Sequence, residues 1–179
     1  MKKRLRIEYF LVAAVMLLLF VGSIAATNFF FQKEMVAQQE TYLRRKNTLL
    51  TDQLPPSVFE KGQLTNQQQL LVTHALDDAE ERVTLLQKNG TVFFDSSQNE
   101  PLESHKKRPE IAAVLSGATY GSALRKSKTL NKELLYVATP VLKSGEIVGI
   151  IRISEQTALF SKNIQSFRRY IIFTFGILF

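Results

Sequence analysis

Apolar residues run without a single charge through residues 9–31, and this uninterrupted pattern predicts a helix that spans a membrane. At 1.5 Å per residue, the segment would form about 34 Å of helix, enough for a hydrocarbon core of about 30 Å. Basic residues precede it, which predicts that residues 1–8 are a cytoplasmic tail and that the following chain is extracellular. A cleaved signal peptide is the alternative, because Ser23 and Ala25 are small residues at suitable spacing. The apolar run is longer than a signal peptide needs, so we favour a retained transmembrane helix.

Residues 32–54 contain no proline or glycine, which predicts that the helix continues beyond the membrane. Apolar pairs recur every seven residues in this segment, a pattern typical of a helix that packs on a parallel partner in a homodimer. The pairs are Met35/Val36, Tyr42/Leu43 and Leu49/Leu50. Polar residues lie midway between the pairs, so an amphipathic helix that packs on its own domain is the alternative. The helix is expected to end before Pro55, because the residue before a proline is pushed out of helical geometry.

A second helix and a hairpin are predicted next. Thr65 suits the N-cap of a helix from residue 66 to about residue 79. Residues 82–87 and 91–96 then flank the pair Asn89-Gly90. An Asn-Gly pair between two apolar runs is the strongest short-range signal for a β-hairpin.

A further helix and three strands follow the hairpin. Pro109 suits the first turn of a helix, Glu110 favours its positive end, and Gly117 suits the position after its last residue. The three predicted strands cover residues 119–127, 134–141 and 146–154. The last two are almost continuously apolar, as in strands covered on both faces of a sheet. The short connections predict an α+β fold with a five-stranded antiparallel sheet over about residues 65–154 and with helices gathered to one side.

The C-terminal part of the chain repeats the membrane pattern. Apolar residues at helical spacing predict an exit helix over residues 156–169. Residues 170–179 are uncharged and apolar, but ten residues of helix span only about 15 Å. We interpret them as the start of a second transmembrane helix that is truncated.

Composition and charge exclude several classes of function. The absence of cysteine excludes disulfides, thiolate metal sites and cysteine nucleophiles. The net charge of +7 includes +3 from residues 1–8, and acidic residues are interspersed with the remaining basic ones, so no nucleic-acid partner is expected. The acidic residues between Asp77 and Glu81 lack the spacing of a calcium loop, and we expect no metal or other cofactor. No nucleophile with a nearby base stands out, so this chain is not expected to be an enzyme.

Five short motifs follow one another between the two apolar segments. They are Asp95-Ser96, His105-x-x-Arg108-Pro109-Glu110-Ile111, Arg125-x-Ser127-x-Thr129-Leu130, Leu135-Tyr136-Val137-Ala138-x-Pro140 and Gly149-Ile150-Ile151-Arg152. In this order they resemble the extracellular sensor region of PhoR-type sensor histidine kinases of Gram-positive bacteria, over about residues 32–169. The resemblance implies a single Cache-like domain, related in fold to PAS domains, in a two-component system of phosphate regulation.

The same resemblance implies a location and partners. The protein would lie in the cell membrane, and a response regulator would be reached only through a kinase domain that this sequence lacks. His74 and His105 lie in the extracellular part, so neither is expected to accept a phosphoryl group. The alternatives are the sensor region of a chemoreceptor or a membrane-bound cyclase, and a stand-alone anchored adaptor that binds an envelope protein.

Sensor domains of this fold typically hold small ligands between the sheet and the helix and loops that cover it. The candidate ligand-binding residues are His105, Arg108, Arg125, Ser127, Tyr136 and Arg152. Their chemistry suits a small anionic or cell-envelope ligand, because guanidinium groups offer planar sets of donors and a helix start offers backbone N–H groups. Each candidate also has a structural alternative, as an exposed cation, an ion-pair partner, a loop cap or a core side chain. Arg152 lies in an apolar strand, where its charge needs a partner, either a structural carboxylate or a ligand.

Overall fold

The computed structural model describes residues 2–76, 81–97, 103–127 and 131–157. The described residues divide into two units, one that ends at Ala37 and one that begins at Gln38. The predicted exit helix and the predicted second membrane segment lie outside the described residues, except for residue 156, which belongs to the last strand, and residue 157, which follows it.

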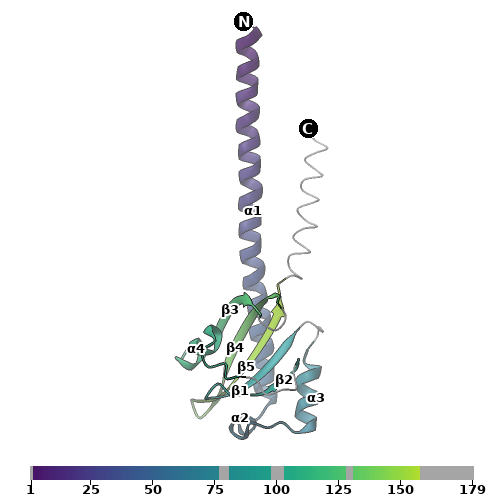
Figure 1. The fold of residues 1–179 in the computed structure, drawn as a ribbon, viewed down its shortest axis with the longest axis vertical. Coiled ribbons are helices and arrows are strands. Elements are labelled where there is room, and N and C mark those ends of the chain that lie inside the picture. The colour runs from purple at the N-terminus through teal and green to yellow at the C-terminus, as the bar shows by residue number, and fades with distance from the viewer. Residues whose placement is uncertain (1, 77–80, 98–102, 128–130, 158–179) are drawn as a thin grey trace. The chain divides into compact units, whose positions relative to one another are not determined.

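Helix α1, Lys2–Gln53, is continuous and begins the chain (Figure 1). Among the described residues, it is the one helix whose length and composition suffice to cross a membrane. Most of its large apolar side chains from Ile7 to Phe30 are exposed, as lipid-facing side chains would be. The helix ends just before the prolines, in agreement with the expected effect of Pro55.

The sheet of the second unit has five strands in the order β2-β1-β5-β4-β3 (Figure 1). They are β1 Arg82–Gln87, β2 Val92–Asp95, β3 Gly121–Lys126, β4 Glu133–Lys143 and β5 Glu146–Gln156. All neighbouring strands are antiparallel. β5 is the central strand and pairs with β1 on one side and with β4 on the other. The predicted α+β class with a five-stranded antiparallel sheet is confirmed.

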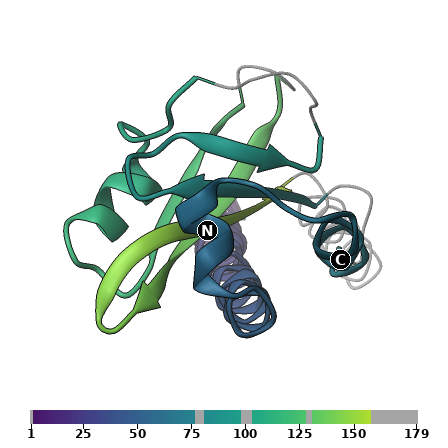
Figure 2. The same ribbon diagram turned by 90° about the horizontal axis from the view of Figure 1, so that it is seen from below.

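The C-terminal part of α1 covers one face of this sheet together with α2, Pro56–Lys61 (Figure 2). Leu43 and Leu50 of α1 are buried, and Asn47 donates a hydrogen bond of 2.9 Å to the backbone carbonyl of Val137 in β4. Phe59 of α2 packs so closely on β5 that a Cβ atom at Gly149 would lie 2.3 Å from its ring. Close approach of the helix therefore depends on glycine at this position.

Helix α4, Pro109–Leu115, packs on the face of the sheet opposite to α2. On β5, Gly149 faces α2 and the next residue, Ile150, faces α4, because successive residues of a strand point to opposite faces. Its Ile111 and Val114 form a core with Leu86, Ala138 and Ile150. Helices thus cover both faces of the sheet, and the expectation that they gather on one side is wrong. The continuously apolar strands already indicated two covered faces, but the short connections did not reveal which helix crosses to the second face.

Two shorter helices differ from the predictions. Helix α3, Asn66–His74, begins with the expected cap, in which Thr65 and Gln68 form a reciprocal capping box, but it ends earlier than residue 79. Helix α2 was not predicted. The expected effect of Pro55 covers only the end of the preceding helix, whereas the adjacent Pro56 occupies the first turn of the next one, where a missing N–H costs nothing.

Candidate functional site

A group of buried polar side chains lies between the sheet and α4, and we call it the arginine cluster. Its members are Arg82, Thr84, Asp95, His105, Glu110, Arg125, Tyr136 and Arg152. Strand register brings several of them together, because Thr84 pairs with both Arg152 and Asp95 across β1, β5 and β2. The sheet therefore supplies most of the cluster on rigid strands, and α4 supplies Glu110 from its first turn.

Arg152 is the centre of the cluster and is only 2% exposed. Its Nη1 lies 3.3 Å from Oε1 of Glu110, and its Nη2 donates a hydrogen bond of 2.8 Å to Oγ1 of Thr84. Burial lowers the pKa of Arg152 to about 10, an effect that the charge of Glu110 opposes. Arg152 is therefore charged at neutral pH and has a structural carboxylate as its partner.

Glu110 is completely buried and accepts hydrogen bonds from two arginines through a single oxygen. Its Oε1 lies 2.9 Å from Nη2 of Arg125 and 3.3 Å from Nη1 of Arg152. Burial by itself would raise the pKa of Glu110, but the hydrogen bond from Arg125 and the charges of both arginines outweigh burial and lower the pKa. Glu110 is therefore ionised at neutral pH.

Arg125 combines this ion pair with an aromatic contact. Its guanidinium carbon lies 3.7 Å from the centroid of the Tyr136 ring, and that of Arg152 lies 5.1 Å from the same centroid. Cation–π attraction of this kind stabilises charges that have lost part of their hydration. Tyr136 is thus a buried platform for two cations.

Arg82, Thr84 and Asp95 extend the cluster along β1 and β2. Nε of Arg82 donates to Oδ1 and Oδ2 of Asp95 at 2.8 and 3.0 Å, and Oγ1 of Thr84 donates to Oδ2 of Asp95 at 2.8 Å. Arg82 and Thr84 are not among the site residues predicted from the sequence. Their alternation with Val83 and Leu85 was the available signal, since every second residue of a strand lies on the same face.

His105 lies in the loop before α4 and is 7% exposed. Its backbone N–H donates to the carbonyl of Gly90 at 2.9 Å, which ties this loop to the β1–β2 turn. Burial, followed by the charges of Arg152, Arg108 and Arg82, lowers the pKa of His105 to about 4. The imidazole is therefore neutral at neutral pH.

The structure brings four of the six candidate residues into the cluster, namely His105, Arg125, Tyr136 and Arg152. Arg108 lies at its edge, half-buried, where its charge acts on His105 and its carbonyl accepts the first hydrogen bonds of α4. Ser127 is buried after the end of β3, where its backbone bonds with Asn131 and Lys132 close a turn.

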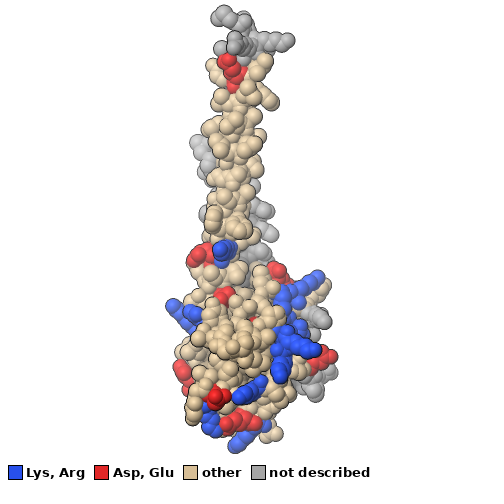
Figure 3. Space-filling view, turned by 90° about the vertical axis from the view of Figure 1, so that its left-hand side faces the viewer, with Lys and Arg blue, Asp and Glu red and all other residues tan. Residues whose placement is uncertain are grey.

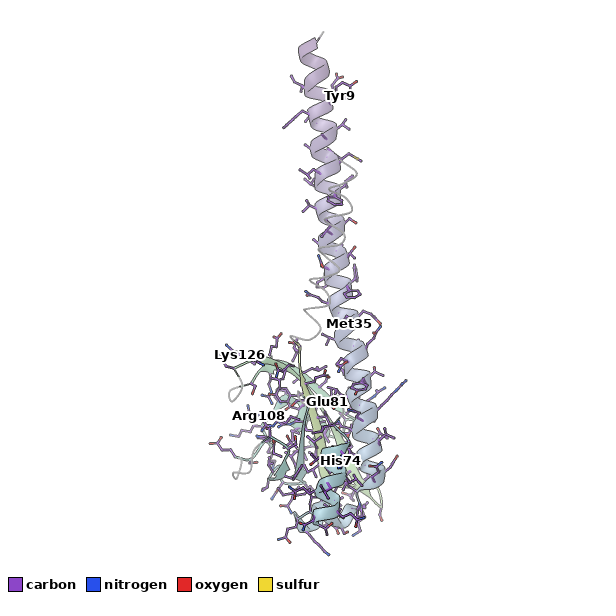
Figure 4. The ribbon with its side chains drawn as sticks, turned by 90° about the vertical axis from the view of Figure 1, so that its right-hand side faces the viewer. Tyr9, Met35, His74, Glu81, Arg108 and Lys126 are labelled. Atoms are coloured by element: carbon purple, nitrogen blue, oxygen red, sulfur yellow. The ribbon has the colours of Figure 1, made fainter. Side chains whose placement is uncertain are left out.

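The cluster carries more positive than negative charge. Three guanidinium groups face two carboxylates, and Figure 3 shows Lys and Arg side chains gathered along one flank of the domain. Arg108 and Lys126 both lie on the side of the domain away from α1 (Figure 4). Within the described part of the chain, four buried cluster atoms have no hydrogen-bond partner: His105 Nδ1, Glu110 Oε2, Arg125 Nε and Arg152 Nε. These properties suit the binding of a small anion.

Other surfaces offer less specific chemistry. One hollow is lined by Phe59, Gln87 and Ile147, among others, and another lies between α1 and α3 beside Leu49 and His74. Neither contains a residue of the arginine cluster. In the described ranges, no group of three or more His, Asp and Glu side chains is placed to hold a metal ion.

The acidic segment around Glu81 is only partly described, because residues 77–80 lie outside the described residues. Glu81 itself accepts hydrogen bonds from Lys46 at 2.6 Å and Tyr42 at 3.2 Å. These bonds join the start of β1 to α1. Glu81 therefore has a structural role at the helix–sheet interface.

Solved structures of sensor domains share this fold. The sensor domain of the V. cholerae histidine kinase DctB matches with a TM-score of 0.57 and 19% identity, over 72% of this chain and 52% of that chain. The ligand-binding domain of the Campylobacter jejuni chemoreceptor Tlp3, in complex with 4-methylisoleucine, matches with a TM-score of 0.51 and 13% identity, over 73% and 56%. The ligand-binding domain of the Pseudomonas aeruginosa amino acid chemoreceptor PctC, in complex with GABA, matches with a TM-score of 0.51 and 12% identity, over 77% and 61%.

The chain spans between half and two thirds of the length of these structures. At such low sequence identity, the structural similarity shows that the fold is shared and nothing more. No curated protein sequence matches the chain. Residues 52–156 match the family model described as Single Cache-like, which covers more than half of the sequence. The chain therefore belongs to the single Cache-like family.

Proposed function

We propose that this chain is the membrane-anchored sensing portion of a two-component sensor histidine kinase of the PhoR type from a Gram-positive bacterium. The family match over residues 52–156 is the observation that carries the proposal. Helix α1 supports it, because the candidate membrane span and the segment that packs on the sheet are parts of the same continuous helix. The order of the motifs between Asp95 and Arg152 supports the PhoR type and a role in phosphate regulation.

In this proposal residues 1–8 are cytoplasmic, residues 9–31 cross the membrane, and residues 32–169 form the extracellular part. A change in the sheet domain would shift the chain that follows β5 against α1 and so move the two membrane segments. The response regulator would be contacted only by the kinase domain of the full-length protein.

We place recognition of a small anion at the arginine cluster. The excess of guanidinium groups over carboxylates supports this, as do the unpaired, buried nitrogens of His105, Arg125 and Arg152. Tyr136 holds the two cations in place, and Arg108 adds charge at the edge. Ser127 would contribute by holding the end of β3, through its bonds with Asn131 and Lys132.

Thermal unfolding of the full chain in detergent with a panel of small carboxylates and phosphate tests this site. At least one anion should raise the melting temperature beyond the effect of sodium chloride at equal ionic strength, and Arg125→Gln should abolish that rise. Lys126→Gln, the neighbouring exposed cation, is the matched control and should keep it. If no anion shifts the wild-type chain, this domain does not recognise small anions at the cluster.

A chemoreceptor sensor is the second candidate, because two of the similar structures are ligand-binding domains of chemoreceptors. The coding sequence that follows Phe179 discriminates between the two. A histidine kinase requires a dimerising helical hairpin with a phospho-accepting histidine and an ATP-binding domain. A chemoreceptor would instead continue into a long helical signalling hairpin with no nucleotide-binding domain.

A further inference from the structure

The carboxylate of Glu110 occupies the place in the arginine cluster that an anionic ligand would need. Its Oε1 lies between Nη2 of Arg125 and Nη1 of Arg152, at 2.9 and 3.3 Å, and the side chain is completely inaccessible to solvent. Any anion that binds both guanidinium groups would compete with this oxygen.

The fit of Glu110 to the two arginines is incomplete. A carboxylate that pairs optimally with a guanidinium uses both oxygens in a bidentate arrangement. Here one oxygen serves both arginines, while Oε2 of Glu110 and Nε of both Arg125 and Arg152 have no partner among the described residues. A free carboxylate, not constrained by a helix, would be able to accept hydrogen bonds from the unpaired Nε atoms of the two arginines.

The cluster is also built so that Glu110 is its most easily displaced member. Arg125 and Arg152 lie on strands held by the sheet, whereas Glu110 lies on the seven-residue helix α4. That helix is attached mainly through the small core around Ile111 and Val114. Withdrawal of Glu110 would therefore loosen the start of α4 without breaking the sheet.

We propose that Glu110 is a built-in occupant of the anion site, and that a small carboxylate binds by taking its place between Arg125 and Arg152. The exchange keeps the charge of the cluster unchanged and turns ligand binding into a movement of α4. This inference rests on the proposed recognition of anions at the cluster, and it adds that the unliganded domain is held by its own carboxylate.

Chemical rescue tests the inference, because Glu110→Ala removes a fragment of the size of acetate. In the full chain in detergent, Glu110→Ala should unfold at a lower temperature than wild type. Sodium acetate at about ten times its dissociation constant should then raise the melting temperature by roughly 3–8 °C above the effect of sodium chloride at equal ionic strength. Acetate should bind this variant at least tenfold more tightly than it binds wild type. If Glu110→Ala does not fold in chloride, the yield of refolded protein in acetate replaces the melting temperature.

Two further variants serve as controls. Glu110→Gln removes the negative charge and should therefore be destabilised. Because it keeps the shape of the side chain and leaves no cavity, it should not show a comparable response to acetate. Glu60→Ala removes a carboxylate from an exposed ion pair with Lys143 and should behave like wild type.

The outcomes separate this inference from the proposed function. If wild type binds an anion and Glu110→Ala binds it no more tightly, the built-in occupant is overturned while anion recognition stands. If acetate rescues only Glu110→Ala and no anion affects wild type, the site between the two arginines accepts a free carboxylate, but displacement of Glu110 in the native chain is overturned together with anion recognition. If acetate neither refolds nor stabilises Glu110→Ala, Glu110 is not a built-in occupant of an anion site. An equal response to acetate in Glu110→Gln would lead to the same conclusion.

Discussion

Arg152 shows how a charged residue is retained in the middle of a buried strand. It is 2% exposed and has Glu110, Thr84 and the Tyr136 ring around it. Loss of one partner from a buried ion pair is costly because the other charge is left without compensation, whereas loss of both partners often costs little.

We expect Arg152→Ala to lower the free energy of unfolding by about 3–5 kcal/mol, since Glu110 would lose one of its two partners inside the domain. Lys143→Ala is the matched control on an exposed ion pair and should cost about 0–1 kcal/mol. The double variant Glu110→Leu/Arg152→Met should cost less than Arg152→Ala alone. Chemical denaturation measures all three, and equal costs for Arg152→Ala and Lys143→Ala would contradict the ion-pair argument.

The buried His105 makes stability depend on pH in a defined window. Its pKa in the folded chain is about 4, below the usual 6.5, so the unfolded chain binds a proton that the folded chain excludes. The stability associated with neutral His105 is therefore complete above about pH 7 and is lost as the pH falls from about 6.5 to 4. Glu110, whose pKa is also lowered, adds a loss that begins only at lower pH, below its usual value of 4.5.

The expected loss for His105 is of the order of 1–3 kcal/mol between pH 7 and pH 4.5. Unfolding by urea across this range measures it. His105→Gln should flatten the dependence, because glutamine does not titrate. An unchanged slope in that variant would assign the acid sensitivity to other groups.

Individual elements were predictable where a local signal determined them. The Asn89-Gly90 turn, the capping residue Thr65 and Pro109 each indicated an element that the structure contains. Helix α2 was missed because a proline that ends one helix also starts the next. Local signals do not state how closely two elements approach, which depends on what lies opposite each residue.

The contact between α4 and β3 illustrates this, because a Cβ atom at Gly121 would lie 2.1 Å from the backbone carbonyl oxygen of Glu110. Gly121→Ala should push α4 away from the sheet and destabilise the domain by about 1–3 kcal/mol. It should also weaken the pairing of Glu110 with Arg125. Ser122→Ala, at the exposed neighbouring position, should change stability little. Thermal unfolding distinguishes the two variants, and equal melting temperatures would show that α4 tolerates the added methyl group.

At the scale of the whole molecule, α1 has two different sides. Leu43 and Leu50 are buried on the sheet, whereas Tyr42 and Leu49 are 38% and 60% exposed. Leu43 and Leu50 thus face the domain, and Tyr42 also reaches it through its hydrogen bond to Glu81, whereas Leu49 is the most exposed member of these two pairs. The packing of α1 on its own domain accounts for the buried residues, and the proposed homodimer would account for the exposed Leu49.

Cysteine cross-linking tests the proposed homodimer, and the absence of native cysteine makes single substitutions unambiguous. In membranes, Leu49→Cys should form disulfide-linked dimers efficiently, because the outer side of α1 would face its partner. Arg44→Cys, an exposed position on the flank toward Tyr120, should cross-link much less. Equal yields at the two positions would contradict pairing through this side of α1.

The proposed orientation in the membrane can be tested with single cysteines and a maleimide that does not cross membranes. Glu60→Cys, in the sheet domain, should be labelled on intact cells because the domain is expected to be extracellular. Lys3→Cys, in the basic N-terminal tail, should be labelled only after the cells are permeabilised. The reverse pattern would invert the proposed topology.

The sequence by itself determined the long apolar helix, the five strands and the α+β class, because these depend on periodicity, turn residues and caps that act over a few positions. It also indicated that Arg152 needs a partner. Only the tertiary structure decided that this partner is Glu110, that α4 covers the face opposite α1, and that Arg82 and Thr84 join the cluster. Those contacts depend on strand order and register, which bring together residues as distant in sequence as Thr84 and Arg152, 68 positions apart, and which no local pattern encodes.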